Sequence, residues 1–196
     1  MRIIAGKYRH INLETLEGEH TRPTKDMVKE ALFSSLGIFD GNESFLDLFG
    51  GSGSMGLEAL SRGCKRVVIN DFFRDAYRII LKNVKKVEEK VEVYNLDYED
   101  CIKTLKDNPF DYIFLDPPYK FADFDKIFNL FVDNQIVKDS TVIIFETAKA
   151  TKIKDQYLNF KEYKTKKYGI SVLHYYKKEV TIWLRLYILE LLIQSH

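Results

Sequence analysis

The most suggestive group of residues in the chain is an acid followed by two prolines and a tyrosine: Asp116, Pro117, Pro118 and Tyr119. Proline has no N–H for a strand ladder and restricts the residue before it, so the preceding apolar run, FDYIFL, must end as a strand at Asp116. The Asp116 carboxylate and the Pro117 carbonyl are acceptors for the two hydrogens of an amine conjugated to an aromatic ring, on which Tyr119 would stack. The pattern indicates group transfer to an exocyclic amine, with a purely structural turn as the alternative.

A second candidate site is the glycine-rich stretch DLFGGSGSMG, which begins at Asp47. Gly51 and Gly53 permit a tight turn and a close approach of the backbone to a ligand, and the helix expected after them offers unpaired N–H groups. A carboxylate just before the loop repels a pyrophosphate and attracts an ammonium group, so Asp47 favours an amino acid-like nucleotide over a dinucleotide. No lysine follows the loop, which excludes a P-loop. An ordinary turn between a strand and a helix is the alternative.

Two further acids end apolar runs. Asp71 is placed to accept hydrogen bonds from both hydroxyls of a ribose, and Phe72 beside it is placed to cover an adenine. Asp97 is placed to accept a hydrogen bond from an exocyclic amine. Each acid is also a good N-cap for the helix expected after it, and for Asp97 alone the capping role is the stronger interpretation.

These residues act together only if strands bring them to one edge of a sheet. Several runs are apolar on both faces, as expected of parallel strands covered by helices on each side; the expected strands are residues 44–49, 66–71, 91–97, 110–116 and 140–148. The segments between them have apolar residues at three- and four-residue spacing, which predicts helices at 54–63, 74–87, 98–107 and 121–134. This alternation predicts a doubly wound α/β sheet, in which ligands bind beyond the carboxyl ends of the strands.

The two flanks follow a different pattern. Residues 1–23 are expected to be a short extended piece, followed by a helix over Thr24–Leu36 with Pro23 before it and Thr24 as its N-cap. Residues 158–178 are expected to form two strands that turn near Tyr168–Gly169, as an antiparallel pair that closes the sheet.

Composition indicates a single globular domain. The 196 residues are 45% hydrophobic and 14% aromatic, enough for one full core. The formal net charge of +1 argues against a uniformly basic coat, although lysines dominate residues 149–178, as a solvated surface or as one that faces phosphates. Cys64 and Cys101 are in no metal-ligand spacing, so we expect reduced thiols and no metal ion. With no signal peptide and no bilayer-spanning run, we expect a cytoplasmic protein that does not enter a membrane.

Taken together, the motifs resemble those of S-adenosylmethionine (AdoMet)-dependent amino-methyltransferases, in which a glycine loop precedes a DPPY sequence three strands later. More narrowly, the chain resembles the RsmD family of bacterial 16S rRNA guanine-N2 methyltransferases. The likeness extends from Met1 to Lys178, in MRIIAGKYR, RPT followed by VKEALFSSL, LDLFGGSGSMGLEALSRG, DPPY and KKYGISVLHYYKK. DPPY alone is shared with DNA adenine and cytosine methyltransferases, whereas the RPT segment and the glycine-loop helix are specific to this family.

The resemblance implies a fold and a domain organisation. The expected fold is a Rossmann-like class I AdoMet-dependent methyltransferase, with a mostly parallel seven-stranded sheet, an antiparallel C-terminal strand pair and a short N-terminal extension. Residues 1–178 would form a single methyltransferase domain, in which 1–36 are the extension with its helix and 37–178 are the core.

The resemblance also implies site residues. Asp47 and the glycine loop would hold the methionine end of AdoMet, Asp71 its ribose, and Phe72 with Asp97 its adenine. The full set of cofactor-binding residues expected is Arg22, Thr24, Asp47, Phe49, Gly51, Gly53, Asp71, Phe72, Asp97 and Tyr98. Arg22 and Thr24 would close the pocket. The catalytic residues expected are Asp116, Pro117, Pro118 and Tyr119.

The function implied is methyl transfer from AdoMet to the exocyclic N2 amine of a guanine. The partner implied is 16S rRNA or an assembly intermediate of the small ribosomal subunit, and we expect the protein to be a monomer. A flipped guanine would stack on Tyr119, and Asp116 would orient its amine more than deprotonate it, because proton loss follows the attack. Two alternatives stay open. One is a DNA adenine-N6 or cytosine-N4 methyltransferase, which usually needs a separate recognition domain; the other is a nucleic-acid-binding protein with a relict cofactor fold.

The chain departs from the family pattern in three places. Lys29 stands where relatives often have arginine, so a role that requires a planar guanidinium is not expected there, and Phe73 stands where relatives commonly have an acid. Residues 179–196 follow the point where the pattern ends. One interpretation is an added amphipathic helix. The interpretation we prefer is that these residues come from out-of-frame translation into a neighbouring gene, or from an overlap with it. The DNA sequence after the Lys178 codon distinguishes the two, because the second interpretation requires another reading frame there.

Overall fold

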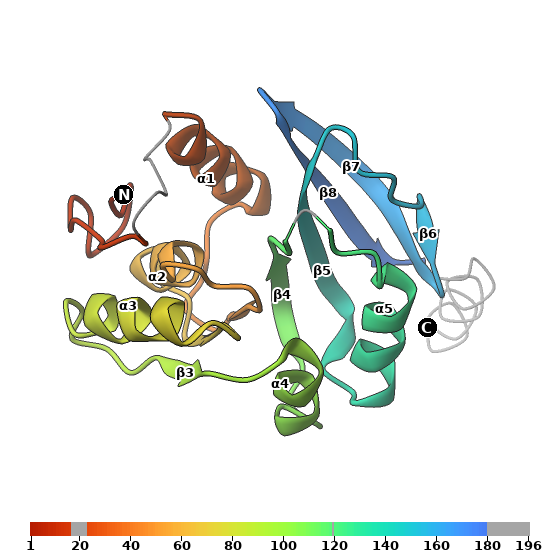
Figure 1. Ribbon diagram of the computed structural model, residues 1–196, viewed down its shortest axis with the longest axis horizontal. Helices are drawn as coiled ribbons and strands as arrows, with labels where there is room; N and C mark the ends of the chain where they lie inside the picture. The colour runs from red at the N-terminus through yellow and green to blue at the C-terminus, as the bar shows by residue number, and fades with distance from the viewer. Residues whose placement is uncertain (17–22, 119, 180–196) are drawn as a thin grey trace, which may run out of the picture.

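A computed structural model describes residues 1–16, 23–118 and 120–179 of the chain, apart from the side chains of residues 23–25 (Figure 1). Its described strands form one sheet of eight, in the order β3-β2-β1-β4-β5-β8-β7-β6. The strands are β1 (Ser44–Asp47), β2 (Arg66–Asn70), β3 (Glu92–Tyr94), β4 (Phe110–Leu115), β5 (Val137–Ala148), β6 (Gln156–Tyr157), β7 (Phe160–Tyr168) and β8 (Ser171–Lys178). The helices are α1 (Pro23–Leu36), α2 (Ser54–Ser61), α3 (Arg74–Val84), α4 (Tyr98–Thr104) and α5 (Phe124–Asp133).

The sheet confirms the predicted doubly wound fold and adds one strand. Strands β1 to β5 pair in parallel, and β8 and β7 form the expected antiparallel pair beside β5. The two strands of that pair are joined at Gly169, whose φ of +56° is left-handed and suits glycine. The additional strand is β6, which pairs with β7 through Gln156 and Tyr157 and, with two residues, is too short to leave a periodic pattern in the sequence.

Helices cover both faces of the sheet (Figure 1). Successive residues of a strand point to opposite faces of the sheet. On the face covered by α1, α2 and α3, which we call the α1 face, Phe45 and Phe114 join one apolar cluster. Leu46 and Ile113 join the cluster under α4 and α5 on the other side. Among the described residues, no helix is long and apolar enough to cross a membrane.

The N-terminal segment is a closed loop rather than the simple extended piece expected. A bridge between Arg2 and Asn12 closes the loop, and the loop docks on α2. The buried Glu58 carboxylate of α2 accepts hydrogen bonds from the N–H groups of Ile4 at 2.7 Å and Ala5 at 3.1 Å. At Gly6 the φ is +82°, and a Cβ there would lie 1.8 Å from the carbonyl oxygen of Ser61, so the loop packs against α2 only with glycine at this position.

Lys29 of α1 completes this junction. Its side chain is 1% exposed, and its Nζ donates to the carbonyl oxygen of Arg2 at 2.6 Å and lies 3.7 Å from Oε2 of Glu58. Burial lowers the pKa of this lysine, opposed by the negative charge of Glu58. A compact ammonium satisfies these partners, so the position holds the N-terminal loop without a guanidinium.

Candidate active site

The strand order places the glycine loop beside the proline corner. β1 pairs with β4, with Asp47 opposite Phe114, so the segments that follow the two strands leave the same edge of the sheet next to each other. The chain winds in one direction from β1 to β3 and in the other from β4 onwards. This is the topological switch point at which doubly wound sheets bind ligands.

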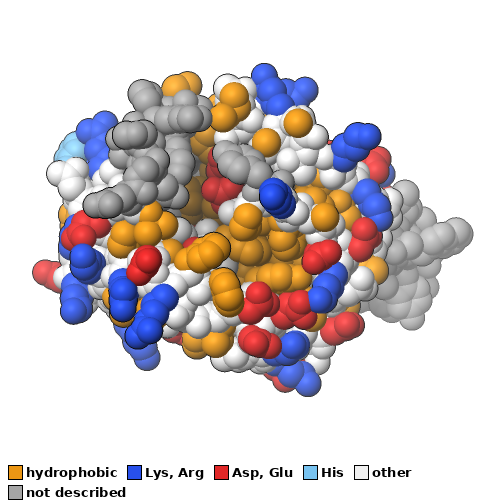
Figure 2. Space-filling view, in the orientation of Figure 1, with side chains coloured by type: hydrophobic (Ala, Val, Ile, Leu, Met, Phe, Trp, Pro, Cys, Tyr) orange, Lys and Arg blue, Asp and Glu red, His pale blue; other side chains and the backbone are white. Residues whose placement is uncertain are grey.

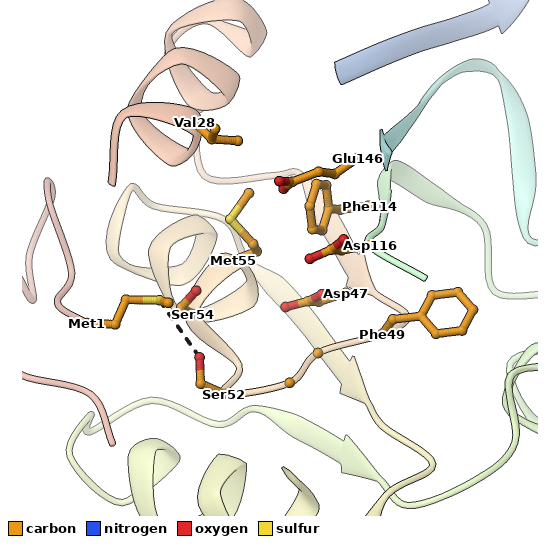
Figure 3. A pocket seen from close by; sticks show the side chains of 12 residues that line it. Met1, Val28, Asp47, Phe49, Ser52, Ser54, Met55, Phe114, Asp116 and Glu146 are labelled. Atoms are coloured by element: carbon orange, nitrogen blue, oxygen red, sulfur yellow. Dashed lines mark hydrogen bonds between the residues drawn. The ribbon is translucent and has the colours of Figure 1, made fainter. Parts of the chain in front are cut away.

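A pocket opens at this point, with an empty volume of about 550 Å³ including its open mouth. Side chains from α1, α2 and the N-terminal loop face those from the strand ends across it (Figure 3). Its lining residues are Met1, Val28, Asp47, Phe49, Gly50, Gly51, Ser52, Ser54, Met55, Phe114, Asp116 and Glu146. In the space-filling view, acidic side chains lie within a hollow beside a broad hydrophobic area (Figure 2).

The glycine loop takes the conformation that its sequence predicts. Gly51 and Gly53 have φ of +55° and +76°, and Gly53 precedes the first residue of α2. The Gly51 N–H donates to Oδ2 of Asp71 at 2.8 Å. A Cβ on Gly51 would meet no atom within 4 Å, so the loop leaves space for a ligand on this side.

Asp47 provides the most unusual charge in the pocket. It is fully buried, its Oδ2 accepts from the Gly56 N–H at 3.0 Å, and its Oδ1 has no hydrogen-bond partner among the described residues. Burial raises the pKa of this carboxyl to about 7, opposed by the Gly56 hydrogen bond and assisted by the negative charge of Asp71. A buried acceptor without a partner, in a site lined by backbone, suits the ammonium group of an amino acid.

The two other acids are held by backbone hydrogen bonds. Asp71 accepts from Phe73 N–H at 2.8 Å through Oδ1, in addition to its bond with Gly51, and so joins the glycine loop to the start of α3. Phe72 beside it is 64% exposed. Asp97 is the N-cap of α4 and accepts from Glu99 N–H at 2.9 Å, which confirms the capping interpretation. The roles of these residues toward ribose and adenine stay predictions.

The proline corner follows β4 directly. Asp116 is exposed at the rim of the pocket, Pro117 is half-buried, and Phe121 N–H donates to the Pro118 carbonyl at 2.8 Å, which closes the turn. Tyr119 lies outside the described residues.

The two residues expected to close the pocket are only partly placed. Arg22 lies outside the described residues. Thr24 lies in the first turn of α1, which begins one residue earlier than expected, at Pro23. Val28, one turn further along this helix, lines the pocket, so α1 does cover the site.

An aromatic cluster adjoins the pocket on the side of α4. The Phe49 ring packs against Tyr98 at 5.9 Å and Phe121 at 5.7 Å between ring centroids, and Phe121 packs on Phe124 at 5.3 Å. In the close view the Phe49 side chain points away from Asp47 (Figure 3). Phe49 lines the pocket and Tyr98 packs behind it, and the expected role of both residues in binding a cofactor stays a prediction.

Sequence reasoning missed several pocket residues. Glu146 stands near the carboxyl end of β5, and Met1 and Met55 come from the N-terminal loop and α2. Glu146, the acid in the sequence FETA, lies near the end of the predicted strand 140–148. An acid near the end of an apolar run is the same signal that marked Asp47. Nothing in the local sequence marked the two methionines, because the docking of the N-terminal loop brings Met1 to the pocket.

The described residues contain no group of three His, Cys, Asp or Glu side chains able to hold a metal ion. Cys64 and Cys101 are buried free thiols, and burial raises the pKa of each to about 12. Thiols with such pKa values are unreactive at neutral pH, which agrees with a structural role.

Comparison with known proteins identifies the family. The model of the family described as "Conserved hypothetical protein 95" matches residues 1–177. Ribosomal RNA small subunit methyltransferase D of Haemophilus influenzae is 38% identical over 153 residues, with 76% of this chain and 79% of the relative covered. The Escherichia coli K12 protein of the same name is 31% identical over 148 residues, with 75% of this chain and 74% of the relative covered.

A solved structure agrees with the sequence relatives. The Haemophilus influenzae structure described as "putative methylase HI0767" superposes with a TM-score of 0.75 at 32% identity, covering 91% of this chain and 98% of the other. The chain therefore belongs to the family described as "Conserved hypothetical protein 95", which is the RsmD family, and it has a Rossmann-like methyltransferase fold.

Proposed function

We propose that this protein is an AdoMet-dependent methyltransferase that modifies the exocyclic N2 amine of a guanine in 16S rRNA. One observation carries the proposal: Asp47, whose buried Oδ1 has no hydrogen-bond partner in the described part of the chain, and Asp116 of the proline corner line the same pocket from neighbouring strands. The first suits the amino acid end of a cofactor, and the second suits an amine acceptor. The names of the curated relatives support rRNA as the substrate.

The residues present fit AdoMet as the cofactor. Asp47 would bind the ammonium group of AdoMet, and the open side of the loop at Gly51 would admit the rest of its methionine end. Asp71 would accept hydrogen bonds from its ribose hydroxyls. When bound, AdoMet supplies an electrophilic methyl group on a sulfonium centre. The N-terminal loop and α1 contribute Met1 and Val28 to the lining of the same pocket, where these apolar side chains would limit the access of water to a bound cofactor.

The proline corner would position the acceptor. The lone pair of an aromatic amine is delocalised into the ring, so the amine is a poor nucleophile until its hydrogens are held and its lone pair is freed. The Asp116 carboxylate and the Pro117 carbonyl would accept those hydrogens, and the prolines keep both groups in one geometry. No strong base is required, because the proton becomes acidic once the nitrogen carries a fourth bond.

Replacing the positioning carboxylate tests the proposal. Asp116→Ala is expected to lower the rate of methyl transfer to small ribosomal subunits from a strain that lacks this gene by at least about 100-fold, because the amine is no longer oriented. AdoMet binding, measured by calorimetry, should change little. Asp100→Ala, which removes an exposed carboxylate on α4, is the matched control and should leave both quantities unchanged.

The acceptor is identified by mass mapping of 16S rRNA from the deletion strain. One guanine should lose its N2 methyl group and regain it when the purified protein and AdoMet are added. An intact methylation pattern in the deletion strain, or a wild-type transfer rate in Asp116→Ala, would contradict the proposed function.

A further inference from the structure

A row of acids runs along the pocket edge of the sheet. On β4 and β5, Phe114 pairs with Ile144 and Leu115 with Phe145, so the next residues along the two strands are Asp116 and Glu146. Phe114 and Ile144 belong to the cluster on the α1 face, and by alternation the acids two residues later point to that same face. Neighbouring strands lie about 4.8 Å apart, so the backbones of these two residues stand side by side.

Both acids reach the pocket. Asp116 and Glu146 are among its lining residues, and the close view shows the Glu146 side chain pointing in from the β5 side, on the same side of the sheet as Asp116 and Asp47 (Figure 3). Glu146 is half-buried, and on its far side β5 pairs it with Leu173 of β8. The strand therefore holds this carboxylate in place beside the proline corner, away from the glycine loop.

The atom next to the reacting amine differs among nucleobases. In guanine the N2 amine neighbours N1, which carries a hydrogen and donates. In adenine the N6 amine neighbours N1, and in cytosine the N4 amine neighbours N3, and both of these ring nitrogens are acceptors. An ionised carboxylate is an acceptor only, so a carboxylate next to the amine-binding corner pairs with guanine and opposes the lone pair of adenine or cytosine.

We infer that Glu146 is a specificity-determining residue that binds the N1–H of guanine while Asp116 and Pro117 bind the N2 amine. This inference rests on the proposed function and deepens it, because it assigns the choice of guanine to a residue of β5. The two strands present acceptors to a base edge that carries only donors at N1 and N2. A base with a lone pair at the same place leaves Glu146 facing an acceptor, at a cost that favours guanine.

The experiment removes the N1–H donor of the acceptor base, with a substitute base that also lacks the guanine O6. The guanine identified by mass mapping is replaced by 2-aminopurine, which keeps the 2-amine but has a lone pair at N1. The substituted 16S rRNA is assembled by splinted ligation and reconstituted into small subunits. The ratio of kcat/KM for the guanine and 2-aminopurine particles is measured for wild type and for Glu146→Gln. Glutamine has nearly the shape of glutamate, and its amide can donate to N1 of 2-aminopurine.

Wild type should prefer guanine by at least about 100-fold, since a site built for a hydrogen bond strongly rejects a base that cannot make it. In Glu146→Gln the preference should fall at least tenfold, partly through a gain on 2-aminopurine. Glu146→Asp keeps a carboxylate acceptor and should retain most of the preference for guanine. This variant therefore separates the loss of the carboxylate from a general effect of substitution on folding. Calorimetric AdoMet affinity should be unchanged in both variants. Asp139→Asn, at the other end of β5, is the matched control and should keep the wild-type ratio.

The inference would be overturned if Glu146→Gln had the wild-type ratio of kcat/KM for the two particles, or if it lost the same factor on both bases. In either case, methylation of guanine N2 by the wild-type protein would still support the proposed function. Failure to find a guanine acceptor by mass mapping would instead remove the proposed function, and with it the basis for this role of Glu146.

Discussion

At the residue scale, Asp47 shows that the proposed ligand site has a cost for the stability of the protein without a ligand. Its carboxylate is removed from water, and among the described residues its Oδ1 has no hydrogen-bond partner; burial makes the charged form unfavourable and raises the pKa to about 7. The ordinary pKa of 3.8 applies in the unfolded chain. The folded protein therefore binds a proton that the unfolded chain has released, and its stability decreases as the pH rises from about 4 to about 7.

This linkage predicts opposite responses of stability and cofactor affinity. Asp47→Asn should raise the melting temperature of the protein without cofactor most at about pH 8 and least at about pH 4, because the penalty begins when the carboxyl of the unfolded chain ionises and is complete above the folded pKa. The same variant should bind AdoMet about 10- to 100-fold more weakly, since a hydrogen bond to a charged partner contributes about 1.5–3 kcal/mol. Scanning calorimetry and binding calorimetry check the two parts.

For wild type, AdoMet affinity should increase between about pH 6 and 7.5 as the Asp47 carboxyl ionises. Binding near pH 6.5 should release protons, which calorimetry detects as a dependence of the enthalpy on the ionisation enthalpy of the buffer. An affinity that is flat over this range would show that the carboxyl is already charged before the cofactor binds.

At the element scale, α2 has two functions. Its first turn follows the glycine loop, and its Glu58 anchors the N-terminal loop through Ile4 and Ala5 and faces Lys29 of α1. Arg62, one turn later on the same helix, lies 2.8 Å from Oε1 of Glu58. The helix therefore connects the glycine loop to the two elements that cover the pocket, through a single buried carboxylate.

Removing that charge should loosen the cover. Glu58→Gln is expected to lower the free energy of unfolding by about 3–5 kcal/mol, because Lys29 stays buried without its counter-charge and the glutamine amide opposes a backbone N–H. Urea denaturation checks the value. Asp75→Asn, which breaks the exposed Arg78–Asp75 pair of α3, should cost less than about 1 kcal/mol. Equal losses in the two variants would argue that the Glu58 network is not a buried anchor.

At the scale of the whole molecule, the row that contains the acids continues into a basic surface. Glu146 pairs with Leu173 of β8, and Leu173 pairs with Lys166 of β7, so a lysine stands two strands from the pocket on the α1 face. Lys164 lies on the same face, 5.3 Å from the centroid of the Tyr175 ring. Burial and the charge of Lys166 lower the pKa of Lys164. Lysines interleaved with aromatic rings beside the proposed amine-binding site suit an RNA backbone.

Reversing two of these charges should weaken RNA binding and leave the chemistry intact. Lys164→Glu with Lys166→Glu is expected to raise the Kd for small subunits and to reduce the slope of log affinity against log salt by about 1 to 2, because each lysine would contact a phosphate. AdoMet affinity should not change. Lys65→Glu, in the turn before β2 at the opposite edge of the sheet, is the control. A salt slope equal to that of wild type would place the RNA on another face.

The sequence by itself determined the elements and the chemistry of their ends. Apolar runs and spacing predicted the strands that define the fold, and DLFGGSG and DPPY predicted a glycine loop and a proline corner, because glycine and proline restrict the backbone locally. The same reasoning could not find β6, which has two residues, or the closed form of the N-terminal loop, whose partners Glu58 and Ser61 are more than 50 residues away in the chain. Residues 180–196, Arg22 and Tyr119 lie outside the described residues, so their predicted roles stay predictions.

Only the tertiary structure decided which ends share a pocket. Strand order is set by long-range pairing, so the sequence could not show that β1 and β4 are neighbours, or that the register of β4 and β5 sets Glu146 beside Asp116. Asp47 is an ordinary acid in the sequence. It becomes a group that titrates near neutral pH because packing removes water from around it, and packing is a property of the folded molecule alone.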